Sequence, residues 1–384
     1  MNLSGRAIKA SERLLRGTRF SPDNIRSVLV LEYTLPLGCC VHLTPLYEAI
    51  KRAHPEVTLT VATRGLGAAL LRHHRYIDHL IETPDPLTGT FGAAKALRAE
   101  MSSRGIRPDC ILTGASDQRT RIALLALLAG TGWRGGYTLA PQLYHRPLSY
   151  QAELSLIDNN LLAASLAGCS SGHLEPAVFF STADVAAMAA LAQQANPEVK
   201  PLIIMVTQNS GGQRTGWHGS RFAQVIRHAH ETLGCAIIYV GTAADTAAIE
   251  QLRREAGGIG TSLTGKTSVT ELAALLAMSD AVVSLDTGTM HIGRAVGVPM
   301  VVIGPSWQRP LEWLPLGLPQ TRILRGPDRP DVPENYKLDE VEAPAVIEAL
   351  DDLFSTYPPS AASRSQRLQA STSKVDHRKN AARI

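Results

Sequence analysis

Hydrophobic and polar positions follow two alternating patterns along most of the chain. Short continuous apolar runs lead into segments in which apolar residues return every three or four positions, and another apolar run then follows. Runs of the first kind are typical of buried β-strands, and segments of the second kind are typical of helices with one apolar face. Because strands that alternate with helices usually form parallel sheets, the sequence predicts an α/β fold.

The second half of the chain has the clearest alternation. The apolar runs there predict strands over residues 202–206, 236–240, 281–285 and 300–303. The periodic segments predict helices near residues 219–233, 245–255, 269–278 and 290–296, and a last helix over 343–354. Each strand ends in a polar or glycine-rich turn, and ligands of open α/β sheets bind at those carboxyl ends.

The first half gives fewer clear elements. The patterns predict strands over residues 26–32, 57–62 and 110–113, and helices over 44–53, 121–129 and 181–195. Pro45 suits the first turn of the helix that begins at Thr44. Ser181, followed three residues later by Asp184, predicts a capping box. Residues 131–150 mix glycine, proline, arginine and aromatic residues, so we expect an irregular loop there.

The length of 384 residues predicts two or three domains, because one domain usually holds roughly 100–200 residues. We place an N-terminal domain at residues 26–180 and a C-terminal domain at 181–340. A basic segment is expected over residues 1–25, and the helix at 341–354 is expected to cross back to the first domain. Residues 355–384 have few large apolar side chains, and we expect a disordered basic tail.

Charge is spread unevenly over the chain. Its formal net charge of +4 combines +4 over residues 1–28 and +5 over residues 355–384 with a mildly acidic body of −5. A protein that reads nucleic acid would carry its basic patch on the fold itself, so we expect no nucleic-acid partner. Basic ends attract anionic lipid head groups or are simply solvated, and both interpretations remain open.

Cysteine usage and hydropathy indicate a cytoplasmic protein without a metal site. Five cysteines occur without a CxxC pair, and no export signal precedes them, which favours reduced thiols. The histidines lack the spacing of zinc ligands. The longest apolar run, residues 122–129, is far shorter than the roughly 20 residues that span a bilayer.

The strongest chemical signal lies in residues 284–305, SLDTGTMHIGRAVGVPMVVIGP. A buried strand is expected to end at Asp286, followed by a turn at Thr287 and Gly288 and then a helix. The first N–H groups of a helix have no partner within it, and with the helix dipole they attract an anion such as phosphate. The alternative is an ordinary strand–turn–helix in which Asp286 caps the helix.

A second motif, GTSLTGKT at residues 260–267, matches the phosphate-binding loop of NTPases letter for letter. However, it follows the end of a polar helix, whereas a P-loop follows a buried strand. Ser268 and Glu271 also predict a capping box for the next helix. We therefore interpret Lys266 as a turn residue near a bound nucleotide and keep a P-loop NTPase as a less favoured alternative.

The residue order in 284–305 resembles the nucleotide-sugar half of glycosyltransferase family 9, the ADP-heptose:lipopolysaccharide heptosyltransferases. Three further stretches resemble this family in the same order: residues 37–45 (LGCCVHLTP), 211–222 (GGQRTGWHGSRF) and 265–280 (GKTSVTELAALLAMSD). The resemblance extends over about residues 26–354 and is patchy between 60 and 165. It implies a GT-B architecture, in which two Rossmann-like domains with parallel sheets face a cleft.

The resemblance also implies an activity. This is the inverting, metal-independent transfer of a heptose from ADP-heptose to a lipid-linked glycan such as the lipopolysaccharide core, without a cofactor. The expected location is the cytoplasm, and peripheral contact with the inner membrane is left open. The nucleotide sugar would be held by second-half residues: Arg214, Thr215, Asp245, Lys266, Asp286, Thr287, Gly288, Met290 and His291. The acidic acceptor would face basic first-half residues: Arg64, Arg72, Arg119, Arg121, Arg134, His145 and Arg146.

Two positions depart from the family pattern. The family has an aspartate, the expected catalytic base, where this chain has Cys39, and a neutral thiol is a poor general base. Glu32 and His42 are near in sequence, and either could take the proton instead. The basic residue expected at position 215 is replaced by Thr215, although Arg214 could still hold a diphosphate. The cysteine leaves a second function open, a family member that binds nucleotide or glycan without catalysing transfer.

Overall fold

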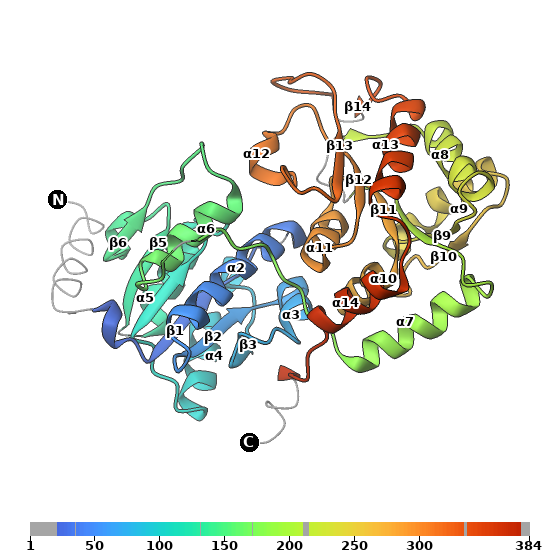
Figure 1. Ribbon diagram of the computed structural model, residues 1–384. Coiled ribbons are helices and arrows are strands. Elements are labelled where there is room, and N and C mark those ends of the chain that lie inside the picture. Colours follow the sequence, from blue (N-terminus) through green and yellow to red (C-terminus); the bar gives the residue numbers. More distant parts are fainter. Residues whose placement is uncertain are drawn as a thin grey trace. The chain divides into compact units, whose positions relative to one another are not determined.

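The computed structural model describes residues 21–34, 36–130, 132–170, 172–209, 215–333 and 336–377. The chain divides into two compact units, whose elements are labelled in Figure 1. The first unit extends to Ala177 and takes in the chain again from Val375, and the second extends from Val178 to Lys374. Each unit is built around its own parallel sheet.

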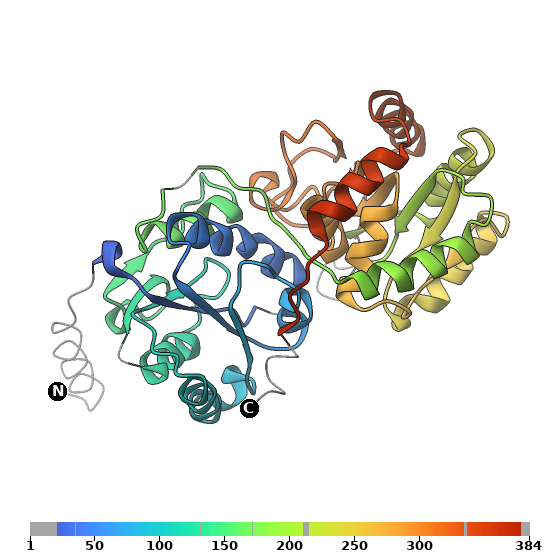
Figure 2. The ribbon, with the colours of Figure 1, turned by 60° about the horizontal axis from the view of Figure 1, so that its bottom comes forward.

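The first unit holds a six-stranded parallel sheet in the order β3-β2-β1-β4-β5-β6. Its strands are β1 (Ser27–Leu31), β2 (Thr58–Thr63), β3 (His79–Glu82), β4 (Cys110–Thr113), β5 (Trp133–Tyr137) and β6 (Arg146–Leu148). One face of this sheet is covered by α2 (Leu37–Ala53), α3 (Gly65–Leu71) and α6 (Leu156–Ser165), and the other by α4 (Pro86–Ser103) and α5 (Thr120–Ala129) (Figure 2). Short 3-10 turns lie at η1 (Pro22–Asn24) and η2 (Pro141–Leu143).

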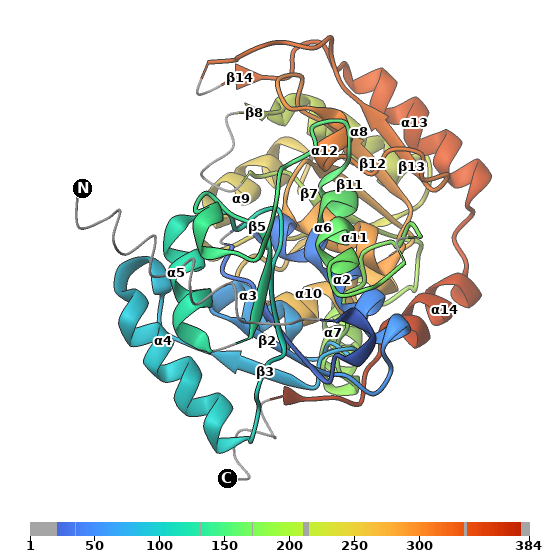
Figure 3. The same cartoon turned by 90° about the vertical axis from the view of Figure 1, so that its left-hand side faces the viewer.

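The second unit repeats this plan in the order β10-β9-β7-β11-β12-β13, again with parallel neighbours throughout. Its strands are β7 (Leu202–Val206), β9 (Ala236–Tyr239), β10 (Thr261–Ser262), β11 (Ala281–Leu285), β12 (Met300–Ile303) and β13 (Thr321–Leu324). One layer of helices consists of α8 (Gly219–Glu231), α9 (Thr246–Glu255) and α13 (Ala343–Thr356), and the other of α7 (Thr182–Ala195), α10 (Val269–Met278), α11 (Gly288–Val296) and α14 (Ala361–Ser371) (Figure 3). Smaller elements are β8 (Thr215–Gly216), which pairs with β14 (Tyr336–Lys337), together with η3 (Ala243–Asp245) and α12 (Pro310–Trp313).

The two Rossmann-like sheets confirm the predicted α/β fold. The strands over 202–206, 281–285 and 300–303 have the predicted bounds, because they are fully buried apolar runs closed by turns. The capping box at the start of α10 is also confirmed. Ser268 Oγ accepts from the Glu271 N–H at 3.3 Å, and Glu271 Oε2 accepts from the Ser268 N–H at 2.7 Å.

Helix α2 begins at Leu37, so the prediction that it starts at Thr44 is wrong. Pro45 therefore lies inside the helix, where it cannot donate to the carbonyl of Val41 four residues earlier. Thr44 supplies the missing bond, because its Oγ1 donates to that carbonyl at 2.8 Å. A side chain thus repairs the helix at the point where proline would interrupt it.

Residues 131–150 are not an irregular loop throughout, because β5 and β6 lie within them. The sequence WRGGY of β5 does not predict a strand, because its two glycines interrupt the alternation of apolar and polar residues. Gly136 has φ near 118°, and a Cβ there would collide with Thr113 of the neighbouring strand. Close approach of two backbones therefore explains a glycine that the sequence suggested belonged to a loop.

The expected disordered tail is wrong for residues 361–371, which form α14 and pack beside α10 (Figure 1). Hydrogen bonds and an ion pair, rather than buried apolar surface, hold this helix against the second unit. Arg364 pairs with buried Asp280 at 2.5 Å, and Arg367 donates to the carbonyls of Ala277 and Ser279. These two arginines are therefore structural and are not available to a lipid surface.

Helix α13 does not cross back to the first unit, contrary to expectation, because it packs on α8, β12 and β13 of the second. The chain rejoins the first unit only at residues 375–377. There the His377 N–H donates to the Arg72 carbonyl at 3.2 Å, and His73 Nδ1 lies 2.8 Å from the Val375 carbonyl. Residues 1–20 and 378–384, which carry much of the terminal basic charge, lie outside the described residues.

Candidate functional site

Each sheet has one point at which the strand order reverses direction, between β1 and β4 in the first unit and between β7 and β11 in the second. Connections leave such a point toward opposite faces of the sheet, which opens a crevice outside the carboxyl ends of the two strands. The side chains that follow these four strands are therefore the candidates for ligand contact.

In the second unit, β11 leads through Asp286 and Thr287 into α11, as predicted. Thr287 is the N-cap of this helix, and its side chain makes no capping hydrogen bond. Asp286 thus precedes the N-cap residue rather than occupying that position. The N–H groups of the first turn of α11 are left without a side-chain cap, and the positive end of the helix dipole lies at the carboxyl edge of the sheet.

Buried polar atoms without partners collect around this helix start. Asp286 and Thr287 are only 3% and 6% exposed. No hydrogen-bond partner for Asp286 Oδ1 or Thr287 Oγ1 occurs in the described part of the chain, although His291 Nε2 lies 3.5 Å from the former. Leaving a buried polar atom unpaired costs roughly 1–3 kcal/mol, so several at one edge indicate a place that a ligand completes.

Neighbouring strands add further atoms of the same kind. Asn209 Oδ1 follows β7, while Trp307 Nε1 and Gln308 Oε1 follow β12, and all three are buried without a partner among the described residues. The sequence alone did not predict these residues. Their position three to five residues after a buried strand next to β11 is the signal that could have found them.

A network of polar bonds fixes the loop after β12. Arg325 donates to the carbonyls of Pro305, Ser306 and Gln308 at 3.2–3.3 Å. Ser306 Oγ donates to Glu340 Oε1 at 2.5 Å, and the Tyr336 hydroxyl donates to the other carboxylate oxygen. Burial alone would raise the pKa of Glu340, but these two hydrogen bonds, a hydrogen bond from its own N–H and the charge of Arg329 together lower the pKa. Glu340 is thus held as a carboxylate that anchors the loop.

At the carboxyl end of the first sheet, Glu32 follows β1 and is 1% exposed. The register that pairs Leu31 with Ala62 places Glu32 next to Thr63, whose Oγ1 donates to Glu32 Oε2 at 3.0 Å. Cys40 Sγ and the Thr34 N–H donate to Oε1. Burial raises the pKa of Glu32 to about 7, and the nearby charge of Asp117 contributes, while the Thr63 hydrogen bond opposes the rise.

Asp117, which sequence reasoning missed, follows β4 on the other side of β1. It is 3% exposed, accepts from the Tyr33 N–H at 2.9 Å and binds the guanidinium of Arg119 at 2.7 and 2.9 Å. Burial raises its pKa, and Arg119 opposes that rise. Arg119 also donates to the Tyr33 carbonyl at 3.0 Å. These contacts fix the segment that carries Glu32.

Comparison with known families and structures identifies the chain. The family model for glycosyltransferase family 9 (heptosyltransferase) matches residues 120–339, more than half of the sequence. The chain belongs to glycosyltransferase family 9. It is a heptosyltransferase-like glycosyltransferase, and its two-sheet fold matches that of GT-B enzymes. No curated protein matches the sequence significantly.

Solved structures of family 9 resemble the whole fold at low sequence identity. A family 9 glycosyltransferase from Veillonella parvula is 18% identical with a TM-score of 0.78, and the match covers 88% of this chain and 99% of that one. ADP-heptose LPS heptosyltransferase II from E. coli is 17% identical with a TM-score of 0.69, covering 86% and 99%. E. coli WaaC with ADP-2-deoxy-2-fluoro heptose is 16% identical with a TM-score of 0.63, covering 85% and 99%.

The remaining donor-side candidates of this family 9 chain fall into different environments. Met290 and His291 are buried in the first turn of α11, and Lys266 is exposed. Asp245 accepts from the N–H and hydroxyl of Thr242 at 2.7 and 2.8 Å, so a capping box already occupies one of its oxygens. Arg214 lies outside the described residues, as does the side chain of Thr215.

The phosphate-binding loop of NTPases is not formed at residues 260–267. The N–H of Lys266, one of the groups that a P-loop would offer to phosphate, donates to the Leu263 carbonyl at 3.1 Å. Gly265 instead donates to the Gly241 carbonyl at 2.9 Å, which ties the turn to the end of β9. Family 9 membership and this geometry both disfavour the NTPase alternative.

The candidates for the family's catalytic base lie just after β1 and on α2. Cys39 is 6% exposed and His42 is 1% exposed, both within α2. Burial raises the pKa of Glu32 to about 7, as described above. A group with such a pKa can accept a proton at physiological pH.

The arginines expected to bind an acceptor are mostly engaged within the first unit. Arg64 pairs with Asp85 at 3.1 Å, and Arg119 with Asp117, while Arg121 is exposed on α5. Arg134 is 4% exposed, and its guanidinium donates to the carbonyls of Leu143 and Gly132. Because it is buried as a structural residue, we remove Arg134 from the acceptor candidates.

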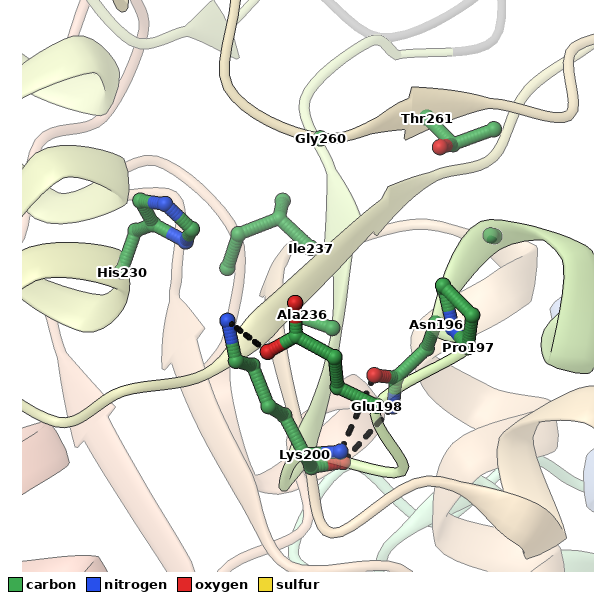
Figure 4. Close-up of a pocket in the computed structure, with 10 residues that line it drawn as sticks. Asn196, Pro197, Glu198, Lys200, His230, Ala236, Ile237, Gly260 and Thr261 are labelled. Carbon is green, nitrogen blue, oxygen red and sulfur yellow. Dashed lines mark hydrogen bonds and ion pairs between the residues drawn. The ribbon is translucent and has the colours of Figure 1, made fainter.

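A surface hollow of about 200 Å³ lies at the amino ends of strands of the second sheet, opposite the carboxyl ends that carry Asp286 (Figure 4). Its lining includes the first residues of β9 and the Glu198–Lys200 ion pair at 2.7 Å. The amino ends of parallel strands are not where ligands of this fold class bind.

Within the described residues, no group of three or more metal-ligating side chains is arranged to hold a metal, and no helix is long and apolar enough to cross a membrane.

Proposed function

We propose that this family 9 enzyme transfers a heptose from ADP-heptose, or a closely similar nucleotide sugar, to a lipid-linked glycan such as the lipopolysaccharide core. The observation that carries the proposal is the start of α11, where the N-cap side chain makes no capping bond and buried oxygens of Asp286 and Thr287 have no hydrogen-bond partner in the described part of the chain. The structural relatives from E. coli, whose ligands are ADP and an ADP-heptose analogue, support the choice of nucleotide.

In this proposal the diphosphate lies against the first N–H groups of α11, at Gly288 and the residues after it. Negative charge grows on the departing diphosphate as the glycosidic bond breaks. Dipoles that are already oriented toward that charge stabilise the transition state more than the substrate, which raises the rate. Arg214 and Lys266 are the cations proposed to assist, and Asp245 is proposed to hold the ribose hydroxyls.

We propose Glu32 as the base that takes the proton of the acceptor hydroxyl, in place of the aspartate that Cys39 replaces. Its pKa of about 7 leaves a substantial fraction ionised at neutral pH while keeping it basic enough to accept a proton. Attack from the face opposite the leaving group inverts the anomeric centre. NMR of the product tests the inversion, and transfer that persists in excess EDTA tests the proposal that no metal is needed.

The decisive test combines calorimetric titration with a transfer assay. The wild-type protein is expected to bind ADP and ADP-heptose and to discriminate against UDP-sugars. Binding of a UDP-sugar in preference to ADP-heptose would contradict the proposed donor.

Cys39→Asp distinguishes a working enzyme from a family member that only binds. A rise in transfer in this variant would mean that the cysteine has slowed the chemistry. The binding function, which Cys39 favours, predicts instead that ADP binds while neither wild type nor Cys39→Asp transfers sugar.

A further inference from the structure

Two buried polar atoms in the loop after β12 are not explained by a bound diphosphate. Trp307 Nε1 and Gln308 Oε1 have no hydrogen-bond partner within the described part of the chain. An indole N–H can only donate, whereas a carboxamide both donates and accepts. Another buried indole of the same unit is satisfied, because Trp217 Nε1 donates to the Val341 carbonyl at 2.8 Å. The lack of a described hydrogen-bond partner for the Trp307 indole is therefore not shared by Trp217.

The loop itself is firmly held. Arg325 binds three of its carbonyls, including that of Gln308, and Glu340 accepts from Ser306 in the middle of it. The Arg329 N–H also donates to the Ser306 carbonyl at 2.9 Å. Because the backbone is fixed by Arg325, just after β13, and by Glu340, after β14, the two atoms without a described partner are presented in a prepared geometry.

The same loop lies beside the start of α11. Strands β11 and β12 pair with Leu285 opposite Ile303, so the residues that follow them leave the sheet at the same level. The loop ends in α12, where the ring of Trp313 lies 6.4 Å from that of His291. His291 belongs to the first turn of α11 and lies near Asp286. The unpaired atoms thus belong to the same edge as the proposed diphosphate position.

The order of strands separates the two ends of the donor. Asp245, the proposed ribose contact, follows β9, which lies on one side of β11 across β7, whereas the Trp307 loop follows β12 on the other side. If the diphosphate lies at α11 with the nucleoside toward β9, the transferred sugar extends toward β12. Sugar hydroxyls both donate and accept, which matches an indole N–H beside a carboxamide.

We infer that Trp307 and Gln308 form the subsite for the transferred sugar, in which each side chain hydrogen-bonds a sugar hydroxyl. This inference rests on the proposed function, because it takes a nucleotide sugar as the donor. It adds that recognition of the sugar, as distinct from the nucleotide, resides in the loop after β12.

Calorimetry of the full chain with ADP and with ADP-heptose, without acceptor, tests the subsite. Trp307→Phe and Gln308→Leu each remove the polar atoms while keeping side-chain bulk. Each is expected to weaken ADP-heptose binding about 3- to 10-fold, since one net hydrogen bond is lost, and to leave ADP binding within about two-fold of wild type. Equal weakening of both ligands would assign the contact to the nucleotide and overturn the inference, and so would unchanged affinity for both.

Trp217→Phe is the matched control, because it removes an indole N–H that already has a partner. It should lower the melting temperature without changing the ratio of the two affinities. A ratio shifted as far as in Trp307→Phe would mean that general loosening of the unit explains the result, and the inference would fall. If wild type binds neither ligand, the proposed function fails, whereas binding by wild type with an unchanged ratio in both variants removes only the subsite.

Discussion

At the carboxyl end of the first sheet, the buried carboxyl groups of Glu32 and Asp117 have hydrogen-bond partners, whereas at the carboxyl end of the second sheet buried oxygens of Asp286 and Thr287 have none among the described residues. Glu32 receives three hydrogen bonds, and Asp117 is shared between Tyr33 and Arg119. In the second unit Asp286 and Thr287 keep oxygens without a hydrogen-bond partner among the described residues, although the strand order around both places is the same. One topology therefore supports two different states of its ligand-binding edge.

This difference matches the two tasks of a sugar transfer. An edge that holds a charged donor benefits from dipoles and polar atoms that wait for the ligand. An edge that moves a proton benefits instead from a carboxyl in a fixed, dry environment that shifts its pKa toward neutrality, as burial does for Glu32. Substitutions at the two edges should accordingly separate chemistry from binding.

The largest expected effect is the loss of transfer in Glu32→Gln. Removal of a general base lowers the rate roughly 10²- to 10⁴-fold, while calorimetric ADP affinity should stay unchanged because the nucleotide is proposed to bind to the second unit. In wild type, kcat/KM should rise with pH through about 7, as Glu32 loses its proton. Full activity in Glu32→Gln would place the base elsewhere.

Although Glu32→Gln should lose activity, it should become more stable than wild type as the pH rises. The pKa of Glu32 is about 7 in the folded protein against 4.5 for an ordinary glutamate, so the folded state binds the proton more tightly. This stabilisation is complete below pH 4.5 and is lost as the pH rises to 7, which amounts to about 3 kcal/mol. Glu32→Gln cannot ionise, and urea unfolding should show it gaining on wild type between pH 5 and pH 8.

Glu340 offers a contrast in the second unit. Its lowered pKa favours the charged form in the folded state, so its contribution is present above the unfolded pKa and is lost as the pH falls. Glu340→Gln should therefore lose stability relative to wild type at pH 7 and recover part of that loss at low pH. If the stability of both variants relative to wild type changed with pH in the same direction, the opposite pKa shifts of Glu32 and Glu340 would be contradicted.

A smaller effect is expected from Thr287→Val, which keeps the shape and removes an unpaired hydroxyl. If a ligand completes this oxygen, ADP affinity should fall by about 10-fold. Thr60→Val makes the same change at a buried, unpartnered hydroxyl inside β2 of the first unit. That control should leave ADP binding unchanged and slightly raise the melting temperature, because no ligand uses the hydroxyl it removes.

The smallest effect concerns the C-terminal helix. Arg367→Gln removes donors to the carbonyls of Ala277 and Ser279 and should cost about 1 kcal/mol in urea unfolding. Exposed Lys374→Gln carries the same charge change and should alter stability by less than about 0.5 kcal/mol. Equal stability of the two variants would mean that the hydrogen bonds of Arg367 contribute nothing to the stability of the second unit.

The sequence predicted the second unit better than the first. Strands such as Ala281–Leu285 are continuous apolar runs, and the box of Ser268 and Glu271 is a local signal that needs no distant contact. The first unit contains elements whose stability comes from elsewhere. Gly136 of β5 is explained by the neighbouring backbone, and Pro45 is tolerated because Thr44 satisfies the carbonyl that it leaves unpaired.

Local patterns alone therefore determined the α/β class, the strand that leads to Asp286 and the helix start after it. Only the tertiary structure decided which strand ends meet, because β1 and β4 are brought together by crossovers that no short pattern records. It thereby decided that Glu32 lies beside Thr63, near the charge of Asp117, in an environment that raises its pKa. It also decided that the indole N–H of Trp307, in the loop beside α11, has no hydrogen-bond partner among the described residues. Burial and hydrogen bonding depend on neighbours that are distant in sequence, and these neighbours set the chemistry of each edge.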